Sequence, residues 1–145
     1  MAPCLTDSLE TILVVDDNET VLSVVAAILR EAGFVVLTAR CGADALKLAA
    51  ANSGEIDLLL SDIDMSGMSG PALGQKLKKI RPDLHVMLMS GGGIDGSLLV
   101  LNYGWAFIEK PFVSSKLVQM VLEVVRSPDR SQPGGNEFDS RKDKG

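Results

Sequence analysis

The chain has 145 residues, of which 46% are hydrophobic and 23% are charged. This length and composition are those of one globular domain with one core, and they exclude disorder for most of the chain. Nineteen acidic against fourteen basic residues give a net charge of −5. Because nucleic-acid binders carry a basic surface, we expect no direct binding of DNA or RNA.

The sequence shows no sign of a membrane span, secretion or disulfide bonding. No apolar run reaches the ~18 residues that a membrane span needs, and residues 1–4 lack the charged-then-apolar order of a signal peptide. The two cysteines, Cys4 and Cys41, have no CxxC or CxxxH companion, which argues against a disulfide framework or a zinc site. We therefore expect a soluble protein of the reducing cytoplasm, with no contact to membranes.

Short apolar runs alternate with longer runs of helical period from residue 11 to residue 126, which we take as the folded domain. This alternation predicts βα units around a parallel sheet, with helices on both faces. The predicted strands cover residues 11–15, 34–38, 57–61, 85–89 and 106–108. The predicted helices begin near Glu19, Ala43, Pro71, Ile94 and Ser115.

Residues with strong local preferences mark several of the predicted boundaries. Gly33 suits the end of the first helix, Pro71 the first position of the third, and Ser114 the N-cap of the last. Residues 1–10 are predicted to form an N-terminal extension. The polar stretch 127–145 is predicted to be a disordered tail.

Chemically active side chains follow four of the five predicted strands. Asp16 and Asp17 follow the first, Asp62 ends the third, Ser90 follows the fourth and Lys110 follows the fifth. In a doubly wound sheet the first and third strands are neighbours, and ligands bind beyond the carboxyl ends of the strands, so we expect the three carboxylates to converge. At about 4 Å and an effective dielectric constant of about 20, each like-charged pair costs about 4 kcal/mol, so the cluster needs a cation or must protonate.

Oxygen ligands without histidine or cysteine favour magnesium. Three carboxylates, one Mg²⁺ and the Lys110 ammonium sum to zero charge. A phosphoryl group would meet there a metal, an ammonium and the Ser90 hydroxyl, which is the positioning that phosphoryl transfer requires. One carboxylate would then be the nucleophile and form an aspartyl phosphate.

Taken singly, these residues have ordinary interpretations. Asp16 and Asp17 suit an acidic helix N-terminus, and Lys110 alone suits a solvated surface lysine. Lys110 precedes Pro111, however, and a cis bond there would aim the lysine inward. The combination at the strand ends therefore favours a site.

Four segments form a pattern that is typical of one family. They are ILVVDD at 12–17, DLLLSD at 57–62 followed by Met65, Met68 and Gly70, MSG at 89–91, and FIEKPF at 107–112. With them, the stretch from residue 11 to residue 126 resembles a response-regulator receiver domain of two-component signalling. The resemblance implies a flavodoxin-like (βα)₅ fold, a doubly wound parallel α/β sheet with strand order 2-1-3-4-5.

The resemblance also implies the metal site and the acceptor. Asp62 would be the phosphoacceptor. Mg²⁺ would be held by Asp62, Asp17 and the main-chain carbonyl of Asp64, and Asp16 would act through a metal-bound water. The protein would then be a phosphorylation switch rather than an enzyme, limited to self-phosphorylation and autodephosphorylation.

In the same way, the resemblance implies the parts of the switch. Lys110 would pair with the phosphoryl oxygens, and Ser90 would turn toward the phosphoryl group while Phe107 turns inward. The fourth helix, the fifth strand and the last helix would form the surface that changes, where a homodimer is one option. Ser66 stands where the family usually has proline and Gly91 where alanine is common, which leaves the phosphorylated lifetime open.

Two further details concern the subtype and the partner. The Ser90–Gly91 pair and Gly104 resemble receivers at the C-terminal end of hybrid sensor histidine kinases. The predicted first helix, 19–32, carries an apolar stripe wider than one core face needs. Either the helix is deeply covered, or part of it, at Leu22 and Val25, docks the sensor histidine kinase or histidine-phosphotransfer protein that the resemblance implies.

Other interpretations stay open at this point. Asp62-Ile63-Asp64 also looks like the DxD motif of haloacid-dehalogenase-type phosphatases, but that family places its acidic pair after the nucleophile, whereas here Asp16 and Asp17 precede it. A flavodoxin-like binding module without phosphorylation is another interpretation, and the complete acidic set counts against it. His85, the only histidine, opens a predicted strand, which favours a structural or rim role over that of a phosphodonor.

Overall fold

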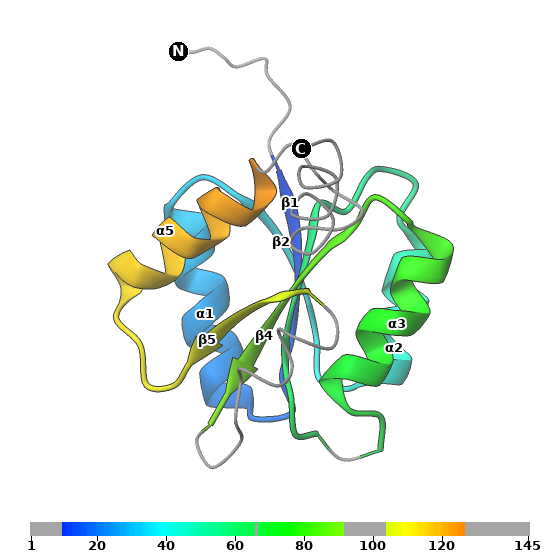
Figure 1. Cartoon of the computed structure of the whole chain (residues 1–145), viewed down its shortest axis with the longest axis horizontal. Helices are drawn as coiled ribbons and strands as arrows, with labels where there is room; N and C mark the ends of the chain where they lie inside the picture. The colour runs from blue at the N-terminus through cyan, green and yellow to red at the C-terminus, as the bar shows by residue number, and fades with distance from the viewer. Residues whose placement is uncertain (1–9, 66, 92–103, 127–145) are drawn as a thin grey trace, which may run out of the picture.

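A computed structural model describes residues 10–65, 67–91 and 104–126 (Figure 1). Five parallel strands form one sheet in the order β2-β1-β3-β4-β5, as predicted. The strands are β1 (Thr11–Val15), β2 (Val35–Ala39), β3 (Leu58–Asp62), β4 (His85–Ser90) and β5 (Ala106–Glu109). The described helices are α1 (Glu19–Glu31), α2 (Gly42–Ala51), α3 (Gly70–Ile80) and α5 (Ser114–Val125).

The helices cover both faces of the sheet. Figure 1 shows α1 and α5 on one side and α2 and α3 on the other. Two apolar cores result, one between the sheet and the α1–α5 layer and one between the sheet and the α2–α3 layer. The predicted fourth helix near Ile94, most of the predicted extension and the predicted tail lie outside the described residues. None of the described helices has the length and apolar character required to cross a membrane.

Two strands, β2 and β3, begin one residue later than predicted. The Phe34 N–H donates to the Leu29 carbonyl (3.1 Å), so Phe34 completes the end of α1 and β2 begins at Val35. Gly33 ends the helix as predicted, with a positive φ of 103°. The third strand extends to Asp62, because the Ile63 N–H still donates to the Met89 carbonyl (3.0 Å).

Three helices begin one residue earlier than predicted, at Gly42 (α2), Gly70 (α3) and Ser114 (α5). Pro71 is the second residue of α3, whose N-cap is Ser69, with its hydroxyl accepting from the Ala72 N–H (3.2 Å). Ser114 is the first residue of α5 rather than its N-cap, because the Val113 carbonyl already accepts from the Leu117 N–H (3.1 Å). A β-extended residue without a capping side chain therefore precedes α5.

The apolar stripe of α1 faces the core. Leu22 and Val25 are only 7% and 1% exposed and pack in the α1–α5 layer. For these two residues the structure therefore favours the covered-helix interpretation, because a wide stripe does not reveal which of its residues face outward. Val24 is 52% exposed and is the outward apolar residue of this helix.

His85 is buried at the amino end of β4, at the opposite end of that strand from Ser90. Its backbone N–H donates to the Asp57 carbonyl (3.1 Å), and the Asp57 carboxylate accepts from the Thr11 N–H (2.8 Å). The only histidine thus lies in the framework, away from the acidic end of the sheet.

Arg81 ties α3 to the end of α2. It follows the last residue of α3, and its guanidinium donates to the carbonyls of Gly54 (3.0 Å), Ala49 (2.9 Å) and Asn52 (2.9 Å). A cation at a helix C-terminus also interacts favourably with the helix dipole. This side chain therefore holds the two helices of one layer in register.

We expect Arg81→Met to lower the free energy of unfolding by about 2 kcal/mol, because carbonyls held by a charged donor lose their partner. Urea denaturation followed by circular dichroism measures this loss. Lys79→Met, on the exposed side of the same helix, is the matched control and should change stability by less than about 0.5 kcal/mol. Equal losses in the two variants would contradict the assignment.

Candidate functional site

The carboxyl ends of the strands bring the predicted site residues to one edge of the sheet. Asp16 directly follows β1, Asp62 is the last residue of β3, Ser90 is the last residue of β4, and Lys110 directly follows β5. The parallel register pairs Asp62 with Met89 and Ser90 with Glu109, so these strand ends lie at the same level. Residues far apart in the sequence therefore meet because the sheet is parallel.

The Lys110 ammonium lies between two carboxylates. Its Nζ is 2.9 Å from Asp62 Oδ1 and 3.2 Å from Asp16 Oδ2. The Lys110 backbone N–H donates to the Ser90 carbonyl (2.7 Å), and the Lys110–Pro111 peptide bond is cis, as the sequence suggested. The lysine is therefore a residue of the cluster and not a solvated surface side chain.

Three carboxylates form the acidic cluster. Oxygen atoms of Asp16, Asp17 and Asp62 all lie within 4.8 Å of one another. Asp16 and Asp62 are buried, whereas Asp17 is exposed at the rim. The Asp16 carboxylate also accepts from the Asn18 N–H (2.9 Å), which fixes its orientation. Asp64 is exposed, and its side chain is not one of this group.

The electrostatics of the cluster are unbalanced. Burial raises the pKa of the Asp62 carboxyl above its ordinary value; the hydrogen bond from Lys110 opposes this increase, and the charge of Asp16 adds to it. Burial lowers the pKa of Lys110, but the hydrogen bond to Asp62 and the charge of Asp16 outweigh burial and raise the pKa. One ammonium among three carboxylates leaves a net charge of −2 (−3 plus +1). Hard oxygen donors with this charge fit a divalent cation such as Mg²⁺.

Two residues to which the sequence analysis gave no role hold the backbone of Asp62. The Ser61 hydroxyl donates to the Asp62 carbonyl (2.9 Å). The Gly70 N–H donates to the Ile63 carbonyl (3.0 Å), and a Cβ at Gly70 would overlap the Asp62 carbonyl oxygen. The sequence did contain a signal for this contact: Gly70 stands at the start of a helix, and glycine is favoured where two backbone segments approach closely.

The two predicted switch residues lie on neighbouring strands. Ser90 is buried at the end of β4, beside the cluster. Phe107 is half-buried in β5, opposite Leu88 of β4, and packs against the core beneath α2 and α3. The aromatic side chain therefore has both a buried and an exposed side.

Residues 12–122 match the family model of the response regulator receiver domain, and the chain belongs to this family. Sensor kinase CckA of Brucella abortus is 31% identical over 82% of this chain and 13% of its own length. The DNA-binding transcriptional regulator NtrC of Escherichia coli (strain K12) is 31% identical over 85% of this chain and 26% of its own length. The chain thus spans only a small part of these relatives.

Solved structures agree. The receiver domain from the hybrid histidine kinase CckA is 35% identical, with a TM-score of 0.68 over 80% of this chain and 99% of that chain. A response regulator receiver domain protein from Clostridium thermocellum is 29% identical, with a TM-score of 0.74 over 81% of this chain and 94% of that chain. The predicted family resemblance is confirmed.

The chain is therefore a receiver domain of two-component signalling, a family of phosphoacceptor switches rather than classical enzymes. The family binds Mg²⁺ at an acidic pocket and interacts with histidine kinases and phosphotransfer proteins. Membership in this family favours the receiver interpretation over the phosphatase and the cofactor-binding module.

We expect Asp62→Asn to stabilise the protein at neutral pH in the presence of EDTA. The neutral amide removes the cost of burying a charge and the repulsion from Asp16 and Asp17, whereas its oxygen accepts a weaker hydrogen bond from Lys110, which leaves a net gain of about 1 kcal/mol. Chemical denaturation measures the difference. Asp44→Asn, an exposed carboxylate outside the cluster, is the control and should change little; an equal or lower stability of Asp62→Asn would contradict the electrostatic account.

Proposed function

We propose that Asp62 accepts a phosphoryl group from a phosphohistidine of a sensor histidine kinase or a histidine-phosphotransfer protein in the cytoplasm. The observation that carries this proposal is the Lys110 ammonium, 2.9 Å from Asp62 and 3.2 Å from Asp16, the two buried carboxylates of the acidic cluster. We take residues 11–126 as the receiver unit, and the 35% identity to the CckA receiver supports a likeness to receivers of hybrid histidine kinases.

In this reaction a carboxylate oxygen of Asp62 attacks the phosphorus of the donor. The new O–P bond forms as the P–N bond breaks, and the electron pair returns to the imidazole nitrogen of the donor. The Lys110 ammonium hydrogen-bonds the phosphoryl oxygens and keeps the acceptor oxygen oriented before transfer. Asp62 would also accept a phosphoryl group from a small phosphodonor, and water would later hydrolyse the aspartyl phosphate.

Asp16, Asp17 and Asp62 are the side chains that would hold Mg²⁺, together with the main-chain carbonyl of Asp64. Their support is the set of three carboxylates within 4.8 Å and its net negative charge. When bound, the cation supplies neutralisation of the charge that develops on the transferred phosphoryl group. The Asn18 N–H orients the Asp16 carboxylate, and the resemblance to the family implies that Asp16 would act through a metal-bound water molecule.

Ser90 and Phe107 would transmit the change. The Ser90 carbonyl accepts a hydrogen bond from the backbone N–H of Lys110, which directly follows β5. A shift of Ser90 toward the phosphoryl group would therefore move the end of β5 as well as the end of β4. Phe107 lies half-buried three residues before Lys110, and its inward turn would fill the space that Ser90 leaves. The changing surface would include β5, α5 and the predicted fourth helix, where a homodimer remains one option.

The donor would dock beside Lys110. An apolar groove of about 470 Å³ lies between α1 and the segment after β5, lined by Val21, Val24, Pro111 and Phe112 next to Lys110. Val24 is 52% exposed and lies in this groove, so its apolar side chain is available to a docking partner. DNA binding is named for the NtrC relative; for this acidic chain we propose none of its own.

The acceptor is tested with acetyl phosphate and Mg²⁺. We expect an acid-stable, base-labile adduct of one phosphoryl group on the wild-type protein, none in EDTA, and none on Asp62→Asn, because only a carboxylate oxygen at this position can attack. Intact-protein mass spectrometry measures it. An adduct on Asp62→Asn, or steady turnover of phosphate monoesters by the wild type, would overturn the proposal.

The docking groove is tested by charge. We expect Val24→Glu to slow phosphotransfer from a cognate histidine donor at least about tenfold, because a desolvated carboxylate opposes docking. Labelling by acetyl phosphate should be unchanged. Ile80→Glu, at a 55% exposed position of α3, is the matched control; equal effects of the two variants on transfer would place the donor elsewhere.

A further inference from the structure

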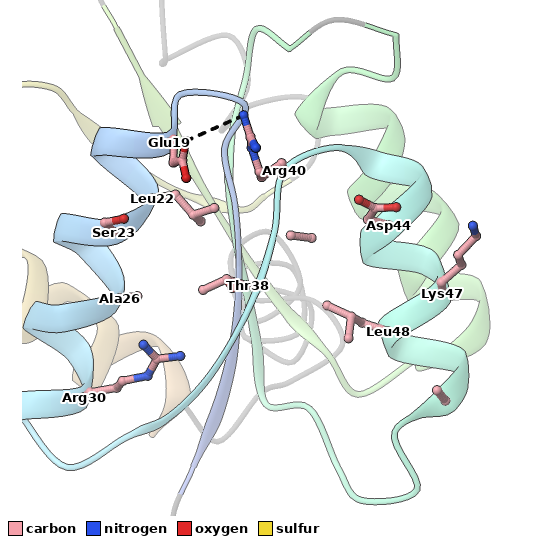
Figure 2. Close-up of a pocket in the computed structure, with 12 residues that line it drawn as sticks. Glu19, Leu22, Ser23, Ala26, Arg30, Thr38, Arg40, Asp44, Lys47 and Leu48 are labelled. Carbon is pink, nitrogen blue, oxygen red and sulfur yellow. Dashed lines mark ion pairs between the residues drawn. The ribbon is translucent and has the colours of Figure 1, made fainter.

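The open edge of the sheet carries a second groove. In the described part of the chain β2 is the edge strand, and a groove of about 770 Å³ runs along it between α1 and α2 (Figure 2). Thr38 lies in the middle of the groove, between the two helices (Figure 2). None of the residues that line it belongs to the groove beside Lys110. An edge strand of this kind is a template for pairing with another strand.

The register shows which backbone groups face outward. The Val35 N–H donates to the Glu10 carbonyl (3.0 Å), and the Ala39 carbonyl accepts from the Asp16 N–H (3.2 Å), so both residues face β1. Backbone direction alternates along a strand, which turns Val36 and Thr38 toward the open edge. The Arg30 guanidinium donates to the Val36 carbonyl (3.2 Å), which confirms that this carbonyl points toward the open edge and not toward β1.

The charged residues of α1 that line the groove are arranged so that two antiparallel copies of this helix would be complementary. Glu19 lies beside Arg40, just beyond the carboxyl end of β2, with 4.0 Å between the charged atoms. Arg30 lies beside Val36, nearer the amino end of the strand. Thr38 is midway between these two levels (Figure 2). A twofold rotation about Thr38 therefore exchanges the level of Glu19 with that of Arg30.

The middle of the same helix leaves room for such an approach. Between Glu19 and Arg30, three residues of α1 line the groove: Leu22, Ser23 and Ala26. Ser23 and Ala26 have small side chains. Their positions are symmetric about the midpoint of Glu19 and Arg30 in the sequence. In a twofold arrangement Ser23 would thus face the partner's Ala26, and no large side chain would separate the helices.

We propose that a second copy of this chain pairs at this edge, with the two β2 strands antiparallel and Thr38 opposite the partner's Thr38. Each Thr38 N–H would donate to the partner's Thr38 carbonyl, and each Glu19 would lie between its own Arg40 and the partner's Arg30. The interface is isologous, so every contact occurs twice. This association goes beyond the proposed phosphoryl transfer and does not depend on it.

The association is expected to be weak and sensitive to salt. The paired strands are short, and the side chains of Arg40 and Glu19 are 60% and 71% exposed, so ions screen their attraction. Sedimentation equilibrium at low ionic strength over a wide range of protein concentration should show the mass rising from 15.4 kDa toward twice that value. Added salt should return the protein to the monomer.

Charge reversal tests the register. Glu19→Arg and Arg30→Glu should each weaken dimerisation at least about tenfold, and the double exchange should recover much of the loss, because opposite charges again meet across the interface although the contacts to Arg40 and to the Val36 carbonyl are lost. Glu31→Arg, an exposed residue of the same helix outside the groove, is the matched control and should leave the dimer intact. Single reversals without effect, or a double exchange without recovery, would overturn the proposal.

The backbone contact is tested by Thr38→Pro. Proline removes the outward N–H, which makes no bond to β1, and prolines are tolerated on edge strands. We expect a monomer with an unchanged circular dichroism spectrum and unchanged labelling by acetyl phosphate. A wild-type protein that stays monomeric at every concentration would overturn the pairing; this is the result expected if Arg30 or another segment of the chain covers the edge. The result of the phosphorylation experiment does not depend on this outcome.

Discussion

The contact on which the site depends is the ammonium of Lys110 between Asp62 and Asp16. It joins the ends of β1, β3 and β5, because one charged atom lies within 3.2 Å of carboxylates that follow or end two other strands. Without it, three like charges would meet at the carboxyl edge of a sheet whose central strands β1, β3 and β4 are buried. The ammonium offsets only part of this repulsion, and the remaining negative charge is what makes the site suited to a cation and then to a phosphoryl group.

Much of this arrangement could be predicted from the sequence because the topology determines it. Five apolar runs alternating with helices predict a parallel sheet, and a parallel sheet brings Asp16, Asp62 and Lys110 to one edge whatever the details of the loops. Local ends were less predictable. Ser114 has the chemistry of an N-cap, but whether it serves as one depends on which carbonyl accepts the first helical hydrogen bond, and here that carbonyl belongs to Val113.

The parts that could not be predicted are contacts between residues that have no periodic relation. Gly70 lies against the carbonyl of Asp62, and Arg81 reaches the carbonyls that end α2; neither contact follows from hydrophobic pattern or strand order. The orientation of α1 was hidden for a related reason. Leu22 and Val24 look alike in the sequence, and only the angle at which the helix packs decides that one is buried and the other is exposed.

That packing angle places α1 against the core and along the walls of two grooves. Leu22 and Val25 face the core, Val24 lines the groove beside Lys110, and Glu19 and Arg30 line the groove along β2. In the proposed twofold pair the sheets run in opposite directions, so the carboxyl edges of the two copies lie at opposite ends. Each Asp62 then faces away from the other, and a donor that docks on one copy leaves the other accessible. Coupling between the two acceptors would pass through α1, because α1 lines both the groove beside Lys110 and the groove along β2.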